Sequence, residues 1–183
     1  MSDQFPTYRA QMEYVCLGCG ARHPIDELLY TCPSCGGVFL LEDTTFDKLK
    51  EHGGAYWRNL FDSRAATQNT ALRGVFRFYE LMAPVLEQED ILYLGEGNTP
   101  VVDGAPELQK KLNAPSASFK DRGMACAYSY LRALVRKHGW DEVLTICAST
   151  GDTSAAAALY GAYVGHPIKT AVLLPQGKVT PQQ

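Results

Sequence analysis

Four cysteines of the chain fall into two close pairs whose spacing is typical of a metal site. Each pair has the form Cys-x-x-Cys, and twelve residues separate the pairs, which are Cys16, Cys19, Cys32 and Cys35. Two residues between ligands let one backbone knuckle present two thiolates to the same ion, and four thiolates complete a tetrahedral shell. The spacing therefore predicts a structural zinc site. Iron is the alternative metal, and four reduced cysteines without a metal are the simpler alternative.

Two histidines, His23 and His52, are also of a type that binds zinc. We expect both to be surface residues, because four thiolates already close the shell. A closed shell leaves no open position for a substrate, so the predicted metal is structural rather than catalytic. Gly20 and Gly36 follow the two knuckles, where they allow the backbone to turn with positive φ.

A run of hydroxyl residues, Ser149 to Ser154, is the second candidate site. It lies between a β-rich run and a small-residue helix, where open α/β sheets bind their ligands. Free backbone N–H groups at a helix start, together with Ser and Thr hydroxyls, suit a carboxylate. Simple capping of the helix by Ser or Thr accounts for the same residues and is the commoner case.

A lysine at the start of a predicted helix, Lys120, is the third candidate. Most lysines in such positions are merely solvated. The positive end of a helix dipole disfavours a protonated amine, however. Lys120 therefore suits use as a neutral base or in a Schiff base with a cofactor.

These candidates require an α/β framework. Apolar spacing predicts a helix from Lys120 to just before Gly139, and two β-rich runs enclose a small-residue helix, which indicates a parallel βαβ unit. Its strands and helix are expected at residues 143–148, 155–164 and 168–174. The preceding segment, 44–100, is predicted to be mostly helical, with Gly53-Gly54 stopping one helix and Pro84 interrupting another.

Composition is that of a soluble globular protein. The 183 residues are 46% hydrophobic and 20% charged, with a net charge of −3. The charge excludes a broad basic field for nucleic acid or an anionic membrane. Apolar runs are too short to cross a bilayer, and residues 1–10 do not form a secretory signal. We expect a cytoplasmic protein.

Three motifs, in this order behind the paired cysteines, resemble those of the threonine synthase family of fold-type II pyridoxal-phosphate enzymes. They are Leu-Gly-Glu-Gly-Asn-Thr-Pro at 94–100, Ser-Phe-Lys-Asp-Arg-Gly at 118–123 and Ala-Ser-Thr-Gly-Asp-Thr-Ser-Ala-Ala at 148–156. The resemblance runs from Tyr14 to Gln183. It implies an α/β protein with a zinc ribbon at 12–42, followed at 43–183 by part of a three-layer αβα domain of the tryptophan synthase β type.

The resemblance also implies site roles and chemistry. Pyridoxal 5'-phosphate would form a Schiff base with the catalytic Lys120, beside Asp152, while three hydroxyls hold the substrate carboxylate. Those hydroxyls belong to Ser149, Thr150 and Thr153. The implied reaction converts O-phosphohomoserine and water to threonine and phosphate. The partner is then a small-molecule amino-acid phosphate, with no nucleic acid or membrane, and a homodimer is one assembly the resemblance allows.

The chain departs from the family pattern in two places. About a dozen residues of a preceding strand are missing before Ser116, and Asp152 stands where many fold-type II enzymes have asparagine. The family's phosphate cup is not visible either, so the chain alone is expected to be inactive. Alternatives are cysteate synthase, another fold-type II elimination enzyme such as a threonine or serine dehydratase, or, in a different class, a zinc-ribbon interaction module.

Overall fold

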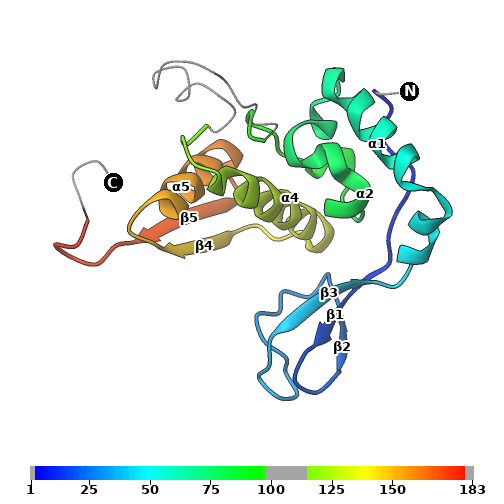
Figure 1. Ribbon diagram of the computed structural model, residues 1–183. Helices are drawn as coiled ribbons and strands as arrows, with labels where there is room; N and C mark the ends of the chain where they lie inside the picture. The colour runs from blue at the N-terminus through cyan, green and yellow to red at the C-terminus, as the bar shows by residue number, and fades with distance from the viewer. Residues whose placement is uncertain (1–2, 98–114, 180–183) are drawn as a thin grey trace.

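The computed structural model describes residues 3–97 and 115–179 of the chain. Figure 1 shows a small sheet that extends away from a larger part, in which α4 lies between the other helices. The small sheet is antiparallel with strand order β2-β1-β3. Its strands are β1 (Met12–Cys16), β2 (Arg22–Pro24) and β3 (Phe39–Asp43).

The turns of the small sheet lie at the two predicted Cys-x-x-Cys knuckles. Gly20 and Gly36 have φ of 74° and 73°, in the left-handed region that favours glycine. Tyr14 pairs with His23 across the predicted hairpin, and its ring stacks on Phe39 with centroids 5.0 Å apart. The predicted hairpin and the positive φ of both glycines are confirmed.

Short helices fill the middle segment, as predicted. The first helix ends before Gly53, and Gly53 then precedes α1 in an extended conformation. The run around Val75 and Phe76 ends at Met82, just before Pro84. The helices are η1 (Phe46–Glu51), α1 (Gly54–Ser63), η2 (Arg64–Ala66), η3 (Thr70–Leu72), η4 (Gly74–Phe78), α2 (Tyr79–Met82) and η5 (Gln88–Asp90).

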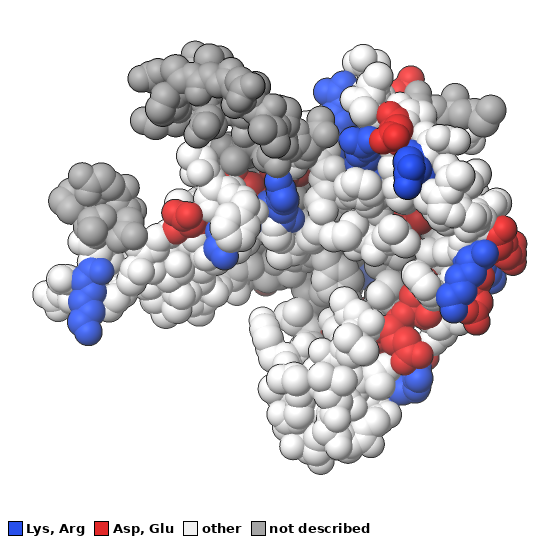
Figure 2. Space-filling view, viewed as in Figure 1, with Lys and Arg blue, Asp and Glu red and all other residues white. Residues whose placement is uncertain are grey.

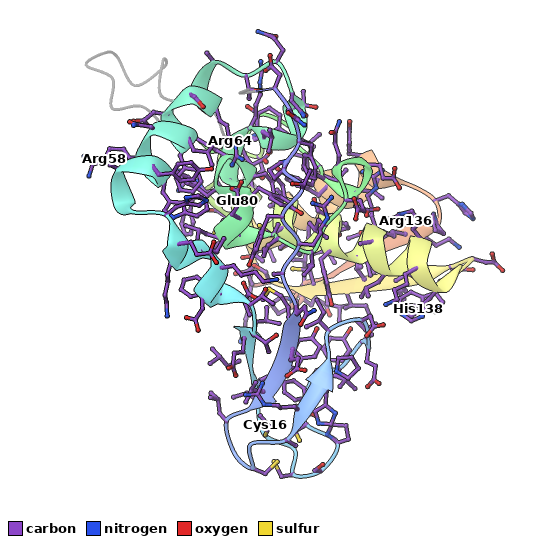
Figure 3. All side chains as sticks on the ribbon, turned by 90° about the vertical axis from the view of Figure 1, so that its right-hand side faces the viewer. Cys16, Arg58, Arg64, Glu80, Arg136 and His138 are labelled. Carbon is purple, nitrogen blue, oxygen red and sulfur yellow. The ribbon has the colours of Figure 1, made fainter. Side chains whose placement is uncertain are left out.

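A buried ion pair joins these helices. Two guanidinium nitrogens of Arg64 donate to the two carboxylate oxygens of Glu80 at 2.7 and 2.6 Å, and one of them also donates to the carbonyl of Arg77 at 2.9 Å. Both side chains are at least 94% buried, and Figure 3 shows them side by side. This bidentate ion pair offsets the free-energy cost of burying the two charges inside the protein.

We expect Glu80→Ala to lower the free energy of unfolding by about 3–5 kcal/mol, because it leaves the Arg64 charge buried without a partner. Urea denaturation followed by circular dichroism measures the loss. Asp62→Ala is the matched control: Asp62 pairs with Arg77, but its side chain is 67% exposed, so the loss should stay below about 1 kcal/mol. Equal losses in the two variants would contradict the prediction.

The α/β part has the predicted order. It consists of α4 (Lys120–His138), β4 (Val143–Ala148), α5 (Asp152–Val164) and β5 (Ile168–Leu173). Helix α4 ends at Gly139, with φ of 63°, and the two strands are parallel with Ile146 opposite Ala171. The predicted βαβ unit and the strand at 143–148 are confirmed, while α5 begins three residues before the predicted start at 155.

Both helices pack on one face of the β4–β5 sheet. The hydroxyl of Tyr128 on α4 lies 2.7 Å from that of Thr170 and donates to the carbonyl of Ala157 on α5 at 3.1 Å. Gly161 packs so closely on β5 that a Cβ there would lie 1.9 Å from Thr170 Oγ1. The sequence places a glycine where α5 must approach the sheet.

The other face of this sheet is exposed and apolar. Leu144, Ile146 and Leu173 are 57–60% exposed, although parallel strands are normally buried on both faces. In the α/β part, the described residues form two layers: the β4–β5 sheet and the helices on one of its faces. The third layer of the expected αβα domain is not present among the described residues. No helix in the described ranges is long and apolar enough to cross a bilayer.

Charged side chains do not form a single-sign field on the face seen in Figure 2. Blue and red residues alternate there, mainly over the segment that contains η1 and α1. The pattern agrees with the small net charge of the chain.

Candidate functional site

The four paired cysteines converge at the tip of the small sheet. All four sulfurs lie within 4.8 Å of one another, with 3.4 Å between Cys16 and Cys35 and 3.7 Å between Cys19 and Cys32. A tetrahedral zinc with Zn–S bonds of about 2.3 Å requires sulfurs about 3.8 Å apart. None of the four is in a disulfide. The cluster, seen around Cys16 in Figure 3, can therefore hold a metal ion.

The backbone packs closely on these sulfurs. The N–H of Gly18 donates to Cys16 Sγ at 3.3 Å. A Cβ on Gly37 would lie 3.0 Å from Cys16 Sγ and 3.2 Å from Cys35 Sγ. Any larger residue at position 37 would press on two of the four candidate ligands.

The thiols differ strongly in their affinity for protons. Burial raises the pKa of Cys32, but hydrogen bonds from His23 and from backbone N–H groups outweigh it and lower that pKa to about 6. The Gly37 N–H lowers the pKa of Cys35, but the neighbouring sulfurs, Cys16 first among them, outweigh it and raise that pKa to about 12. Four thiolates in this space therefore require a cation, and a bound metal ion supplies one.

The two histidines differ in their relation to the cluster. His23 Nε2 lies 3.8 Å from Cys32 Sγ, and its ring meets Phe39 edge-on at 5.6 Å. His23 is thus a half-buried neighbour of the cluster rather than the surface residue we expected. His52 stacks on Tyr56 at 4.0 Å and is exposed, as predicted.

Lys120 is the first residue of α4, and an unusual turn precedes it. Ala117 has φ of 61°, a left-handed conformation that costs a residue with a side chain about 1–3 kcal/mol. The N–H of Lys120 donates to the hydroxyl of Ser118 at 3.3 Å. Its ammonium lies 4.3 Å from the centroid of the exposed Phe119 ring and forms no ion pair with a described residue.

The hydroxyl-rich loop follows β4 and leads into α5 at Asp152. Ser149 and Ser154 are used within the loop: Ser149 Oγ accepts from the Gly151 N–H at 3.3 Å, and the Ser154 hydroxyl donates to the carbonyls of Ser149 and Gly151. No side chain caps α5. The hydroxyls of Thr150 and Thr153 form no hydrogen bond with any described residue, so they and the start of α5 remain available.

A hydrogen bond connects the lysine turn to this loop. Ser118 Oγ donates to Asp152 Oδ2 at 3.0 Å, and Ser118 is 7% exposed. One hydroxyl thus contacts both the backbone of Lys120 and the first residue of α5. We predicted roles for Lys120 and Asp152 but none for Ser118, although Ser118 begins the Ser-Phe-Lys-Asp-Arg-Gly motif.

The first of the three motifs contributes a buried carboxylate. Glu96 is fully buried, and its Oε2 accepts hydrogen bonds from the Tyr160 hydroxyl at 2.7 Å and the Leu94 N–H at 2.9 Å. Gly97 packs against Gly74, where a Cβ would lie 2.9 Å from the Gly74 Cα. Positions 98–100 of the motif lie outside the described residues. Burial raises the pKa of Glu96 above its ordinary value.

The raised pKa of Glu96 predicts that this residue lowers the stability of the folded protein as pH rises. Because the pKa of Glu96 is higher in the folded state, its contribution to stability is full below the unfolded pKa of about 4.3 and is lost as pH rises through the folded pKa. Glu96→Gln keeps an acceptor for Tyr160 and Leu94 but carries no charge. We therefore expect Glu96→Gln to gain stability relative to wild type as pH rises. The measured quantity is the free energy of unfolding of Glu96→Gln minus that of wild type, and it should increase between pH 4 and pH 8.

Chemical denaturation across this pH range measures the difference. Glu96→Ala is the control, because it leaves the Tyr160 hydroxyl and the Leu94 N–H without their partner. It should lose about 1–3 kcal/mol at pH 4, where Glu96→Gln loses little. A Gln-to-wild-type difference that stays constant or falls with pH would contradict the assigned shift.

The described fold and cysteine cluster define a mixed α/β protein with a candidate Cys₄ metal centre. No family model matches the chain. It is 34% identical to threonine synthase 2, chloroplastic, of Arabidopsis thaliana over 173 residues, which are 88% of the chain and 33% of that protein. It is 33% identical to the threonine synthase of Methanocaldococcus jannaschii over 177 residues, 90% of the chain and 38% of that protein.

A bacterial relative matches over a shorter stretch but with higher sequence identity. The threonine synthase of Halalkalibacterium halodurans is 41% identical over 116 residues, 58% of the chain and 30% of that protein. The resemblance to threonine synthases is confirmed. The chain spans about a third of the length of these relatives, consistent with an N-terminal portion of such an enzyme.

Proposed function

We propose that this chain is the N-terminal portion of a threonine synthase that converts O-phosphohomoserine and water to threonine and phosphate. Relatives with that name match it at 33–41% identity. The observation that carries the proposal is the hydrogen bond from Ser118 to Asp152, because it joins the lysine turn and the hydroxyl-rich loop. One substrate must contact both if the lysine and the loop serve a single reaction.

The residues present fit pyridoxal phosphate and its substrate. The Lys120 amine has no competing ion pair in the described ranges, and an uncapped helix start with two free threonine hydroxyls suits an anionic group. When bound, the cofactor supplies an electron sink for carbanion chemistry. Lys120 would hold it covalently, and Asp152 would lie beside it.

The chain's own groups would then position the substrate and move protons. The Lys120 nitrogen would act as general base at the substrate carbons, because it already lies at the reacting centre. The hydroxyls of Thr150 and Thr153, with Ser149 and the N–H groups that start α5, would hold the substrate carboxylate. The Asp152 carboxylate, already hydrogen-bonded by Ser118, would be fixed in orientation.

Zinc would stabilise the small sheet and take no part in the reaction. Four cysteine ligands leave no open position on the metal, and the cluster lies at the tip of the sheet, away from α4 and α5 (Figure 3). We also place the protein in the cytoplasm, where free paired thiols and bound zinc are compatible with a reducing environment.

The test is an assay of the full-length enzyme with pyridoxal phosphate. Phosphate and threonine should both appear from O-phosphohomoserine. Phosphate release that yields cysteate only when sulfite is present would identify a cysteate synthase instead. Absence of cofactor absorbance and of phosphate release would leave the zinc-ribbon interaction module as the remaining function.

A further inference from the structure

A cavity of about 700 Å³ lies beside the carboxyl halves of α4 and α5. It is separate from the lysine turn, because Arg132 on its wall is twelve residues along α4 from Lys120. That interval is about 18 Å at 1.5 Å per residue. The cavity also lies at the start of β5, near Ile168, whereas the hydroxyl-rich loop follows the end of β4.

The wall of this cavity carries a cation without a counter-ion. Arg132 is half-buried and forms no ion pair or hydrogen bond with any described residue. The cavity's two carboxylates are already occupied by Arg136, which donates to Asp90 at 3.0 and 2.5 Å and pairs with Glu89 at 3.3 Å. Figure 3 shows Arg136 on the last turns of α4. A half-buried guanidinium without a partner favours an anion from solution.

The remaining polar side chains of the lining can each donate or accept a hydrogen bond. The hydroxyls of Thr70, Tyr93 and Tyr163 and the imidazole of His166 form no hydrogen bond with any described residue. Apolar side chains complete the lining, among them Leu92 and Ile168, which are 4% and 2% exposed. The hydroxyls and the imidazole can therefore donate to an anion, and the apolar surface suits a hydrocarbon or ring.

Two features of the cavity oppose an anion. The two carboxylates balance the two guanidinium groups, so the lining has no net positive charge. The last residues of α5, Tyr163 and Val164, also line it, and the carbonyl groups at a helix carboxyl end carry partial negative charge. An anionic group is therefore disfavoured at the α5 wall and favoured at the α4 wall, beside Arg132. The apolar part of the ligand would lie toward α5.

We propose that this cavity is a second binding site, for a small organic anion that carries a carboxylate or phosphate on an apolar group. Arg132 anchors the charged group, and His166 and the hydroxyls supply further hydrogen bonds. The site does not depend on the proposed reaction, because it shares no residue with the lysine turn or the hydroxyl-rich loop.

Two probes test the site on the 183-residue chain: inorganic phosphate and benzoate, titrated at constant ionic strength and followed by amide NMR shifts. We expect saturable shifts at Thr70, Tyr93 and residues 163–168 with at least one probe. Arg132→Gln should raise the Kd of the probe that binds about tenfold or more, because the substitution removes a charged hydrogen bond. The control is Arg58→Gln, since Arg58 is exposed, equally unpaired and absent from the cavity.

The outcomes separate the ligand types and the proposal itself. Binding of phosphate alone indicates a phosphate-bearing ligand, and binding of benzoate alone indicates a carboxylate on an apolar group. No saturable binding of either probe overturns the proposal, as does an Arg58→Gln effect equal to that of Arg132→Gln. If Arg132→Gln does not fold, Arg132→Lys and the shift map decide, because shifts away from the cavity also overturn the proposal.

Discussion

Removal of the metal ion from the Cys₄ cluster is expected to unfold the small sheet, residues 12–43, while α4, β4, α5 and β5 keep their structure. The sheet has almost no core of its own, because Cys16 and Cys32 are its only buried residues. Structural zinc in modules of this kind supplies about 10–16 kcal/mol of apparent binding free energy at pH 7. Amide NMR during titration with a chelator measures the two parts separately.

The polar contacts between the small sheet and α4 are too weak to replace the metal. The Lys137 ammonium pairs with the Asp26 carboxylate, and His138 Nε2 donates to the Asp26 carbonyl at 2.8 Å. These are exposed contacts, and a surface pair contributes about 0–1 kcal/mol. The sheet should therefore lose its shift dispersion when the metal leaves, even though it remains tethered to the larger part.

Two cysteine variants, one inside the cluster and one outside it, test this prediction further. Cys32→Ser should lose the metal and unfold the sheet, whereas Cys147→Ala, which removes a cysteine outside the cluster, should retain one metal ion per chain. Native mass spectrometry counts the ions and identifies zinc or iron. Purified protein without either metal, or a sheet that stays folded in excess chelator, would contradict the metal centre.

Lys120→Ala is expected to abolish turnover in the full-length enzyme and to leave the fold intact. The Lys120 side chain contributes little to stability, because its described contact is with the exposed Phe119 ring. As the general base alone it would account for about 10²–10⁴-fold in rate, and loss of the covalent anchor adds to this. The measurement is steady-state phosphate release, with thermal unfolding recorded for the same samples.

Lys50→Ala is the matched control for this variant. Lys50 is an exposed lysine of η1 that pairs with Asp47 at 2.6 Å, and its loss should leave turnover near the wild-type value. Turnover in Lys120→Ala within about tenfold of wild type would exclude Lys120 as the general base. Equal losses in both variants would indicate a structural effect instead.

Features with strong local signals could be predicted from the sequence. The period of apolar residues and the glycine at 139 defined α4, and β-rich runs defined β4 and β5. Cysteine spacing predicted the cluster because one knuckle positions two ligands locally. The 3₁₀ helices of the middle segment were predicted only as helical, since runs of three to six residues carry little periodicity.

Features that depend on distant residues could not be predicted. The bond from Ser118 to Asp152 joins residues 34 apart, and the contact of His23 with Cys32 depends on how the second knuckle folds back. Glu96 belongs to the Leu-Gly-Glu-Gly-Asn-Thr-Pro motif, but its burial against Tyr160, 64 residues away, has no signal in the local sequence. The exposed apolar face of the β4–β5 sheet likewise became visible only once both helices were placed on the opposite face.

Peptide mapping of the borohydride-reduced, cofactor-loaded full-length enzyme tests whether Lys120 is the residue that binds the cofactor. Reduction makes the link between pyridoxal phosphate and its lysine permanent, so mass spectrometry can locate it. We expect one pyridoxyl group per chain, on the peptide that contains Lys120. A pyridoxyl group on Lys110, Lys111 or Lys169, or none on any lysine, would contradict it.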